Sequence, residues 1–272
     1  MNLKRLLPKS MAYRALKIIS IRNLMKSRIG KKEILMSIIS NSYITRGDFV
    51  LSNYGVWMMN NSKDKTFNLS ILGYRNGLEY FIKAVNKPSI FIDIGANQGV
   101  FTLLAAKNKQ FKEIHAFEPN IEVCDYLELN CNYNKVNNVV IHKVAISSSV
   151  GTQNFEVPTN HSGAGKLVNF EHSMHVDCKN NKYLSELVKK WCSDYFIKID
   201  VEGNEFIVLN EIFKSSLTNL VRYLFVEILI SDNINDSVAV KMILKNGFQI
   251  NYIKQKSSNL FDIFFIKLNN IS

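Results

Sequence analysis

From residue 89 onward, short apolar runs alternate with amphipathic segments, which predicts strands alternating with helices. The predicted strands are nearly continuous hydrophobic runs, at residues 90–94, 113–117, 139–144, 196–201 and 221–228. The predicted helices lie between and after them, at residues 100–107, 121–134, 183–190, 205–213 and 235–246. Because strands joined by helices form parallel sheets that are covered on both sides, the pattern predicts an α/β fold with helices on both faces of the sheet.

The two ends of the chain follow other patterns. At the C-terminal end, two β-rich runs at residues 248–253 and 260–267 flank a polar stretch, which predicts an antiparallel β-hairpin at the sheet edge. Before the first core strand, residues 48–51 and 56–60 predict another hairpin, and residues 69–85 predict a helix.

The first forty residues predict two helices, at residues 10–28 and 31–40, with Gly30 ending the first of them. We therefore divide the chain into three parts. They are a basic helical extension at residues 1–44, a hairpin and helix leading into the core at residues 45–88, and a core domain at residues 89–272.

The basic charge of the chain is concentrated in residues 1–32, which hold ten Lys or Arg residues and no acid. They supply ten of the formal net charge of +11, so the remaining 240 residues are near neutral. Such a segment suits contact with an anionic membrane surface, but its cations do not gather on one helical face. A solvated basic helix, or one used in dimerisation, is the equal alternative.

Composition excludes several classes of protein. A hydrophobic content of 47% with 21% charged residues is that of a globular domain. No apolar run reaches the eighteen residues of a spanning helix, and no apolar h-region follows the basic start. Four cysteines without a C-x-x-C pair suit a reducing compartment. We expect a cytoplasmic protein, with the inner membrane surface as the place where residues 1–32 bind.

The richest chemistry follows the first core strand, where Ile90-Phe-Ile-Asp-Ile-Gly-Ala-Asn-Gln-Gly99 joins an acid to two glycines. Asp93 lies near the strand end, and Gly95 and Gly99 allow the backbone to turn and to approach a ligand closely. Glu118 ends the next strand, nineteen residues after Gly99. That is the usual distance for an acid that binds the two ribose hydroxyls of a nucleoside.

Two ligands compete for this loop, a dinucleotide and S-adenosylmethionine. A dinucleotide fingerprint has the form G-x-G-x-x-G, whereas residues 95–99 lack the middle glycine and follow an acid. A carboxylate there would repel a pyrophosphate and attract a cationic ligand with an amino group and a sulfonium. The residues therefore favour S-adenosylmethionine.

Three blocks of sequence resemble the FkbM family of S-adenosylmethionine-dependent methyltransferases. They are Phe91-Ile-Asp-Ile-Gly-Ala-Asn-Gln-Gly-Val-Phe-Thr102, Ala116-Phe-Glu-Pro-Asn120 and Ile197-Lys-Ile-Asp-Val-Glu-Gly-Asn-Glu205. The segments at residues 127–134 and 160–165 also look like family features, and the resemblance covers about residues 45–268. It implies a class I methyltransferase (Rossmann-like) sheet closed by the C-terminal hairpin, with the helical and hairpin extension outside it.

The resemblance also implies roles for single residues. The methionine half of the cofactor would lie against the loop after the first strand, at Asp93, Gly95, Asn97 and Gly99. Glu118 would hold the ribose, and Ala145 and Ile146, just beyond the third strand, would edge the adenine. The family implies O-methylation, often of sugars, polyketides or other small or glycan-bound hydroxyls.

A hydroxyl acceptor needs a base within hydrogen-bond reach, because its proton leaves as the new bond forms. Asp200 ends the fourth strand, and Glu202 and Glu205 follow within a turn, so we expect three carboxylates to converge beside the cofactor. Asp200 or Glu202 is then the base or the acceptor anchor; alternatively, these acids cap the helix that begins near Asn204. No Asn-Pro-Pro-Tyr type motif is present, which argues against an adenine or amide nitrogen acceptor.

Histidines offer two further possibilities. His161 lies on a glycine-containing loop that we expect to be flexible and to close over the acceptor, where it would act as a base near neutral pH. His172, His175, Asp177 and Cys178 are metal-ligand types. The residues around Val176 look like a strand, in which alternation points His175 and Asp177 to one side and His172 elsewhere, so we predict no metal site.

The sequence thus predicts an O-methyltransferase acting on a small-molecule or glycan hydroxyl, most simply a sugar of a surface glycan or of its precursor. One alternative keeps the fold and targets nucleic acid through residues 1–32, which is disfavoured because only Tyr13 is available there for stacking on bases. Another is a cofactor-binding module without catalysis, in which Asp200 and Glu202 are structural.

Overall fold

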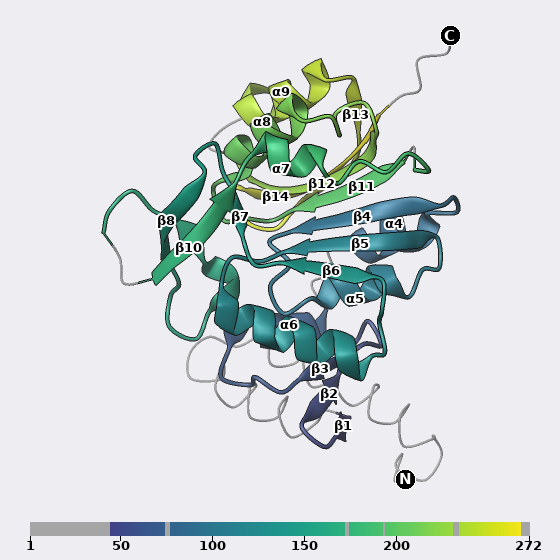
Figure 1. Cartoon of the computed structure of the whole chain (residues 1–272), viewed down its shortest axis with the longest axis vertical. Helices are drawn as coiled ribbons and strands as arrows, with labels where there is room; N and C mark the ends of the chain where they lie inside the picture. The colour runs from purple at the N-terminus through teal and green to yellow at the C-terminus, as the bar shows by residue number, and fades with distance from the viewer. Residues whose placement is uncertain (1–43, 74–76, 172–173, 193, 231–233, 268–272) are drawn as a thin grey trace. The chain divides into compact units, whose positions relative to one another are not determined.

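The computed structural model describes residues 44–73, 77–171, 174–192, 194–230 and 234–267 (Figure 1). The chain divides into two units, residues 1–51 and 52–272. The helices predicted over residues 10–28 and 31–40 lie outside the described residues. In the first unit, β1 (Thr45–Arg46) pairs antiparallel with β2 (Phe49–Leu51). The predicted division at residues 44 and 88 stays a prediction.

The second unit is built on a seven-stranded sheet with the order β13-β14-β12-β11-β4-β5-β6. Its strands are β4 (Ser89–Ile94), β5 (Phe111–Phe117), β6 (Val139–His142), β11 (Tyr195–Ile199), β12 (Val221–Leu229), β13 (Phe248–Gln255) and β14 (Leu260–Lys267). Neighbours from β12 to β6 are parallel, whereas β14 is antiparallel to both β12 and β13. The predicted parallel sheet with a C-terminal antiparallel hairpin is confirmed, and the second strand of the hairpin lies inside the sheet.

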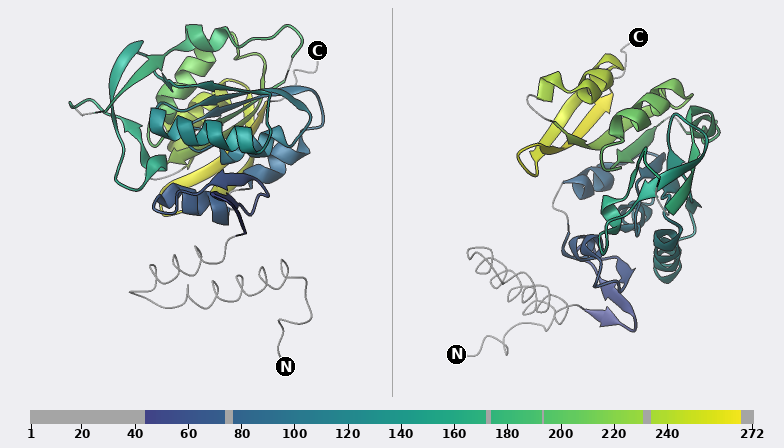
Figure 2. Two further views of the ribbon diagram at one scale, coloured as in Figure 1. Left: turned by 60° about the horizontal axis from the view of Figure 1, so that its bottom comes forward. Right: turned by 90° about the vertical axis from the view of Figure 1, so that its left-hand side faces the viewer.

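Helices cover both faces of this sheet (Figures 1 and 2). One face carries α4 (Leu78–Ala84), α5 (Val100–Ala106) and α6 (Ile121–Tyr133). The other carries α7 (Asn181–Ser185), α8 (Glu205–Lys214) and α9 (Val238–Lys245), which pack into one large apolar cluster with the strands. In α8, for example, Val208 and Leu209 are buried together with Ile212 one turn later, the spacing that places them on one helical face.

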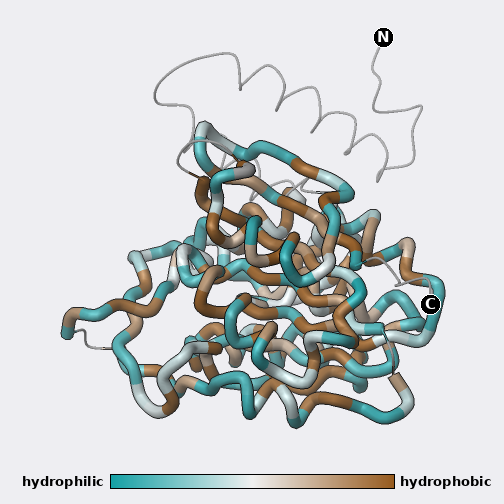
Figure 3. The backbone as a smooth tube through the Cα atoms, turned by 90° about the horizontal axis from the view of Figure 1, so that it is seen from above, coloured by the Kyte–Doolittle hydropathy of each residue, from teal (hydrophilic) through white to brown (hydrophobic). Residues whose placement is uncertain are grey.

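The core strands form where consecutive residues are apolar, so that the side chains on both faces of the sheet are hydrophobic. All five residues of β11 and all six of β4 are buried, as expected for the middle of a sheet that is covered twice. Figure 3 shows hydrophobic segments concentrated inside the second unit and hydrophilic ones in its outer loops. A buried charged residue in such a strand is costly, so Asp93 and Lys198 need partners there.

The single helix predicted over residues 69–85 is wrong. The structure has α3 (Lys65–Leu72) and α4, and the glycines at the facing ends of these helices, Gly73 and Gly77, have φ of +83° and +85°. A positive φ does not fit a right-handed helix, so α3 stops at Gly73 and α4 begins after Gly77. A strand, β3 (Trp57–Met59), forms where the second strand of the N-terminal hairpin was predicted.

A small four-stranded sheet, of which the sequence pattern indicated only the strand around Val176, follows the third core strand. It has the order β7-β10-β8-β9 and consists of β7 (Ala145–Ile146), β10 (Met174–Lys179), β8 (Gly151–Glu156) and β9 (Lys166–Leu167). The short helices η2 (Ser162–Ala164) and η3 (Ile234–Asp236) complete the described elements. Within the described part of the chain, every helix is too short or too polar to cross a bilayer.

Candidate active site

A cavity of about 330 Å³ lies at the carboxyl ends of the core strands. Its walls come from the β4–α5 loop, the end of β5, the start of the small sheet, the loop around η2 and the β11–α8 loop. Open α/β sheets bind their ligands at this edge, because several loops that follow parallel strands meet there. Apart from Asp93 and Glu205, all the residues that the sequence assigned to the site line this cavity.

The β4–α5 loop curls around one end of the cavity because three of its residues are left-handed. Gly95, Asn97 and Gly99 have φ of +80°, +51° and +86°. A Cβ atom on Gly95 would lie 1.9 Å from the backbone oxygen of Asp200, and one on Gly99 would lie 2.1 Å from Leu127 Cδ1. Both glycines are therefore required by conformation and by close packing.

Glu118 lies at the end of β5 and is held by the same loop. Its Oε2 accepts a hydrogen bond from Asn97 N and its Oε1 accepts one from Asn120 N, both at 2.9 Å. Burial raises its pKa to about 7, against the lowering effect of these two hydrogen bonds. Each carboxylate oxygen accepts more than one hydrogen bond, so both oxygens keep capacity for the hydroxyls of a ribose.

Ala145 and Ile146 form β7 and lie with Val144 and Phe117 along the apolar part of the cavity wall. An adenine ring suits such a wall. The cavity therefore presents, along its length, an apolar surface, the Glu118 carboxylate and a group of acids at its far end. These features match the adenine, the ribose and the cationic methionine end of S-adenosylmethionine, so the residues present fit this cofactor.

Asp93 lies behind the cavity wall. It is fully buried, its Oδ2 accepts a hydrogen bond from Thr102 Oγ1 at 2.7 Å, and its Oδ1 lies 3.2 Å from Lys198 Nζ. The structure therefore places the Asp93 carboxylate where it supports the loop from beneath.

Lys198 joins the two halves of the site and was missed by the sequence interpretation. Its Nζ donates to the backbone oxygen of Gly95 at 2.7 Å and lies 3.6 Å from Asp200 Oδ2. Burial lowers its pKa, but Asp93 and Asp200 outweigh that effect and the net shift is upward, so the ammonium stays charged. The signal in the sequence was a lysine within the apolar run Tyr-Phe-Ile-Lys-Ile.

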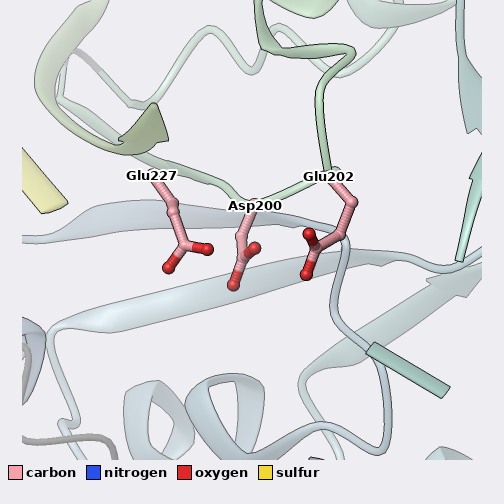
Figure 4. A group of neighbouring side chains, drawn as sticks. All are labelled: Asp200, Glu202 and Glu227. Atoms are coloured by element: carbon pink, nitrogen blue, oxygen red, sulfur yellow. The ribbon is translucent and has the colours of Figure 1, made fainter. Parts of the chain in front are cut away.

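Three carboxylates converge at the far end of the cavity, from Asp200, Glu202 and Glu227 (Figure 4). Each offers one oxygen within 4.8 Å of the other two. Glu202 is an exposed residue by surface area, yet desolvation of its carboxyl raises its pKa to about 7, and the charges of Asp200, Glu227 and Glu205 add to the shift. Glu202 also has a left-handed backbone, with φ of +53°, which is uncommon for a residue other than glycine.

Glu227 is the third member of this group, in place of Glu205. Glu227 comes from β12, is buried, and forms an ion pair with Lys256 on the C-terminal hairpin. Glu205 does not line the cavity in the described structure; its Oε1 accepts a hydrogen bond from Gly203 N at 2.8 Å, at the start of α8. The expectation that Glu205 joins Asp200 and Glu202 is wrong, because capping of its own helix turns the side chain away.

His161 lines the cavity from the loop before η2, where burial and the nearby Lys65 lower its pKa. We expected this loop to be flexible. In the structure it is tied down: Asp64 accepts hydrogen bonds from Ser162, and Thr66 Oγ1 accepts one from Gly163 N.

The weak metal candidate does not form part of this cavity. His175 and Asp177 lie on the exposed side of β10, and Asp177 pairs with Lys179 at 2.8 Å. Cys178 is buried on the other side, and burial raises its pKa to about 11. His172 lies outside the described residues.

The strand order and the cavity define a class I, S-adenosylmethionine-dependent methyltransferase. The family model for the methyltransferase FkbM domain matches residues 93–250, more than half of the chain. The chain therefore belongs to the FkbM methyltransferase family, and S-adenosylmethionine is its cofactor.

The chain is similar, at low identity, to solved structures of other methyltransferases. M. jannaschii TYW2 in complex with AdoMet has 14% identity and a TM-score of 0.45, over 83% of this chain and 89% of that one. Precorrin-6y C5,15-methyltransferase from Geobacter metallireducens GS-15 has 12% identity and a TM-score of 0.42, over 71% of this chain and 86% of that one. An rRNA methylase from Streptococcus thermophilus has 13% identity and a TM-score of 0.43, over 71% of this chain and 95% of that one. No curated protein sequence matches the chain.

Proposed function

We propose that this methyltransferase methylates a hydroxyl oxygen, on a sugar of a surface glycan or of its precursor. The observation that carries the proposal is the group of three carboxylates, Asp200, Glu202 and Glu227, at the far end of the cofactor cavity. When bound, S-adenosylmethionine supplies an activated methyl group, so the protein must align the acceptor oxygen and take its proton.

Glu202 is the general base in this proposal. With a pKa of about 7 it is half ionised near neutral pH, and it therefore both accepts a proton readily and gives it up again after the reaction. Asp200 lies beside the Lys198 ammonium, and in this proposal it anchors the acceptor by accepting a hydrogen bond. Glu227 is paired with Lys256, and its charge helps to raise the pKa of Glu202.

Carboxylates suit a sugar because they only accept hydrogen bonds when ionised, and a sugar offers several hydroxyl donors close together. A nucleobase acceptor is held largely by stacking on aromatic side chains. Aromatic rings do line the cavity, and the centroid of the Phe101 ring lies 5.9 Å from the Lys198 ammonium beside Asp200, so the argument against a nucleic acid rests on charge. A polyanionic strand would be repelled by the acids.

The basic segment at residues 1–32, which lies outside the described residues, supports the glycan part of the proposal. Lipid-linked and nucleotide-linked sugars are anionic, and lipid-linked ones lie at the membrane surface. Ten cations in one segment raise the local concentration of an enzyme at such a surface by electrostatic attraction. This makes the protein a peripheral enzyme of the inner membrane face in our proposal.

Transfer from methyl-labelled S-adenosylmethionine tests the proposal. The full chain is incubated with nucleotide sugars, with lipid-linked saccharides in vesicles and with RNA, and the labelled products are analysed for the methylated atom. We expect label in a saccharide, as an ether, with the wild type and with Glu186→Gln, an exposed carboxylate on another loop. Label in RNA, or on nitrogen, would overturn the proposal in favour of the nucleic-acid alternative.

A further inference from the structure

Asp64 lies before the matched family domain, yet it connects two loops of the active site. It is buried, with 5% of its surface exposed, and it begins α3, where its Oδ1 accepts a hydrogen bond from Phe67 N at 2.8 Å. Its Oδ2 accepts a second bond from Ser162 N at 2.7 Å, and its Oδ1 a third from Ser162 Oγ at 3.1 Å. A single carboxylate thus caps a helix and holds the loop that carries His161.

Ser162 extends this connection to the cofactor loop. Its Oγ accepts a hydrogen bond from Asn97 Nδ2 at 3.0 Å. A hydroxyl has one proton, and donating it to the Asp64 carboxylate leaves a lone pair for the Asn97 amide. The three side chains therefore form one directed chain of bonds, from Asn97 through Ser162 to Asp64, in a site of low dielectric where such bonds strengthen one another.

Other contacts fix the same loop against α3. Lys65 N donates to Asn160 O at 2.8 Å, and Gly163 N donates to Thr66 Oγ1 at 2.8 Å. The packing is close at this point, since a Cβ atom on Gly163 would lie 2.7 Å from the Thr66 side chain. Thr66 and two further residues of α3, Leu69 and Ser70, line the cavity, so the docked loop and α3 form one continuous wall.

We propose that Asp64 is a positioning residue that couples cofactor binding to the order of the loop at residues 160–165. Asn97 lines the cavity from the cofactor loop and His161 lines it from the loop of Ser162, and the hydrogen bond between Asn97 and Ser162 joins these two loops. A ligand that fixes the Asn97 loop therefore fixes Ser162 and, through it, the wall that faces the acceptor. Cofactor binding then prepares the acceptor side before the acceptor arrives.

Coupling of this kind is reciprocal: if the cofactor orders the loop, an ordered loop raises cofactor affinity by the same factor. One hydrogen bond in the chain corresponds to a change of roughly five- to tenfold. The inference rests on cofactor binding and is independent of the acceptor proposed above. A failure of hydroxyl methylation would leave it standing.

Backbone hydrogen exchange of the full chain, with and without S-adenosylhomocysteine, tests the coupling. In the wild type we expect the ligand to slow exchange in residues 160–165 as well as in the cofactor loop. Ser162→Ala removes only the hydroxyl of the chain, and it should abolish the slowing at residues 160–165 while the slowing at the cofactor loop persists. Calorimetry should show that Ser162→Ala lowers the affinity for S-adenosylhomocysteine. The factor should equal the one by which the ligand slows exchange at residues 160–165 in the wild type but not in the variant.

Two more variants separate coupling from folding. Asn97→Gly removes the amide but suits the positive φ of +51°, and it should reproduce the Ser162→Ala result. Ser237→Ala removes a helix-capping serine at α9 and should leave the ligand response unchanged. Equal ligand-induced slowing at residues 160–165 in wild type, Ser162→Ala and Asn97→Gly would overturn the proposal, as would the absence of any slowing there in wild type.

Discussion

The ammonium of Lys198 lies 3.2 Å from the carboxylate of Asp93, and the two residues are register partners on the adjacent strands β11 and β4. Both side chains are buried, and Lys198 also holds the Gly95 carbonyl and lies beside Asp200. The pair therefore connects the interior of the sheet to the cofactor loop and to the acidic end of the cavity. The Asp200 carboxylate thus lies next to an ion pair within the sheet.

Lys198→Met leaves Asp93 buried without its cation, so we expect a loss of about 3 kcal/mol or more in the free energy of unfolding. Adding Asp93→Asn to that variant removes the uncompensated charge and should restore part of the loss. Lys189→Met breaks an ion pair with Glu113 that is partly exposed to water and should cost about 1 kcal/mol or less. Urea unfolding measures all three. Equal costs for the two lysines would contradict the structural role of Lys198.

The rate of methyl transfer should rise with pH through about 7, because Glu202 must lose its proton to act as a base. Below that pH the carboxyl is protonated, and above it the carboxylate is available. Glu202→Gln should lower kcat/KM by roughly a hundredfold or more and abolish this rise. Glu186→Gln should keep the wild-type profile. A wild-type profile retained in Glu202→Gln would assign the base to another residue.

Burial of the Glu118 carboxyl costs stability at neutral pH. Its pKa in the folded protein is about 7, above the ordinary value of 4.5, so the folded state favours the protonated form. The free energy of unfolding therefore falls as pH rises from about 4.5 to 7. Above pH 7 the whole loss, up to about 3 kcal/mol, remains.

The stability of Glu118→Gln relative to wild type should accordingly be higher at pH 8 than at pH 5. In the same variant, affinity for S-adenosylhomocysteine should fall at least tenfold, because one hydrogen-bond acceptor for the ribose is replaced by a donor. Thermal unfolding across pH, and calorimetric titration, measure the two effects. A stability difference that is independent of pH would show that the carboxyl is ionised in the folded protein.

Gly95→Ala should be far more damaging than a matched change at another left-handed glycine. Gly151 has φ of +104° but open space around it, so Gly151→Ala reports the cost of the backbone conformation, about 1 kcal/mol. Gly95→Ala adds a collision with the Asp200 carbonyl, which must move the cofactor loop or the catalytic strand end. We expect loss of S-adenosylhomocysteine binding in Gly95→Ala and unchanged binding in Gly151→Ala.

The core sheet could be predicted because its strands are apolar on both faces, and β4 and β11 are examples in which every residue is buried. Most of the small sheet could not be predicted, because β7 and β9 have two residues each and β8 is largely polar. These strands therefore show no alternation of hydrophobic and polar residues. The helix over residues 69–85 was predicted as one because helical spacing continues across Gly73 and Gly77, whose positive φ only the structure shows.

The candidate site was predictable where its residues follow one another in the chain. Gly95, Asn97 and Gly99, with Glu118 at the next strand end, obey a local spacing rule and meet at the cavity. Glu227 was missed because it reaches Asp200 only through strand pairing across the sheet, and Asp64 because its partner Ser162 is 98 residues away. Glu205 was misassigned because spacing in sequence does not reveal which acid turns back to cap its own helix.

The most direct test of the account is the identity of the atom that receives the methyl group. Full-length enzyme with carbon-13 methyl-labelled S-adenosylmethionine and a panel of nucleotide-linked and lipid-linked saccharides should yield a product whose carbon spectrum shows a methyl ether. That signal should be absent with Glu202→Gln and present with Glu186→Gln. A labelled methyl on nitrogen, or an ether formed equally by Glu202→Gln, would contradict the account.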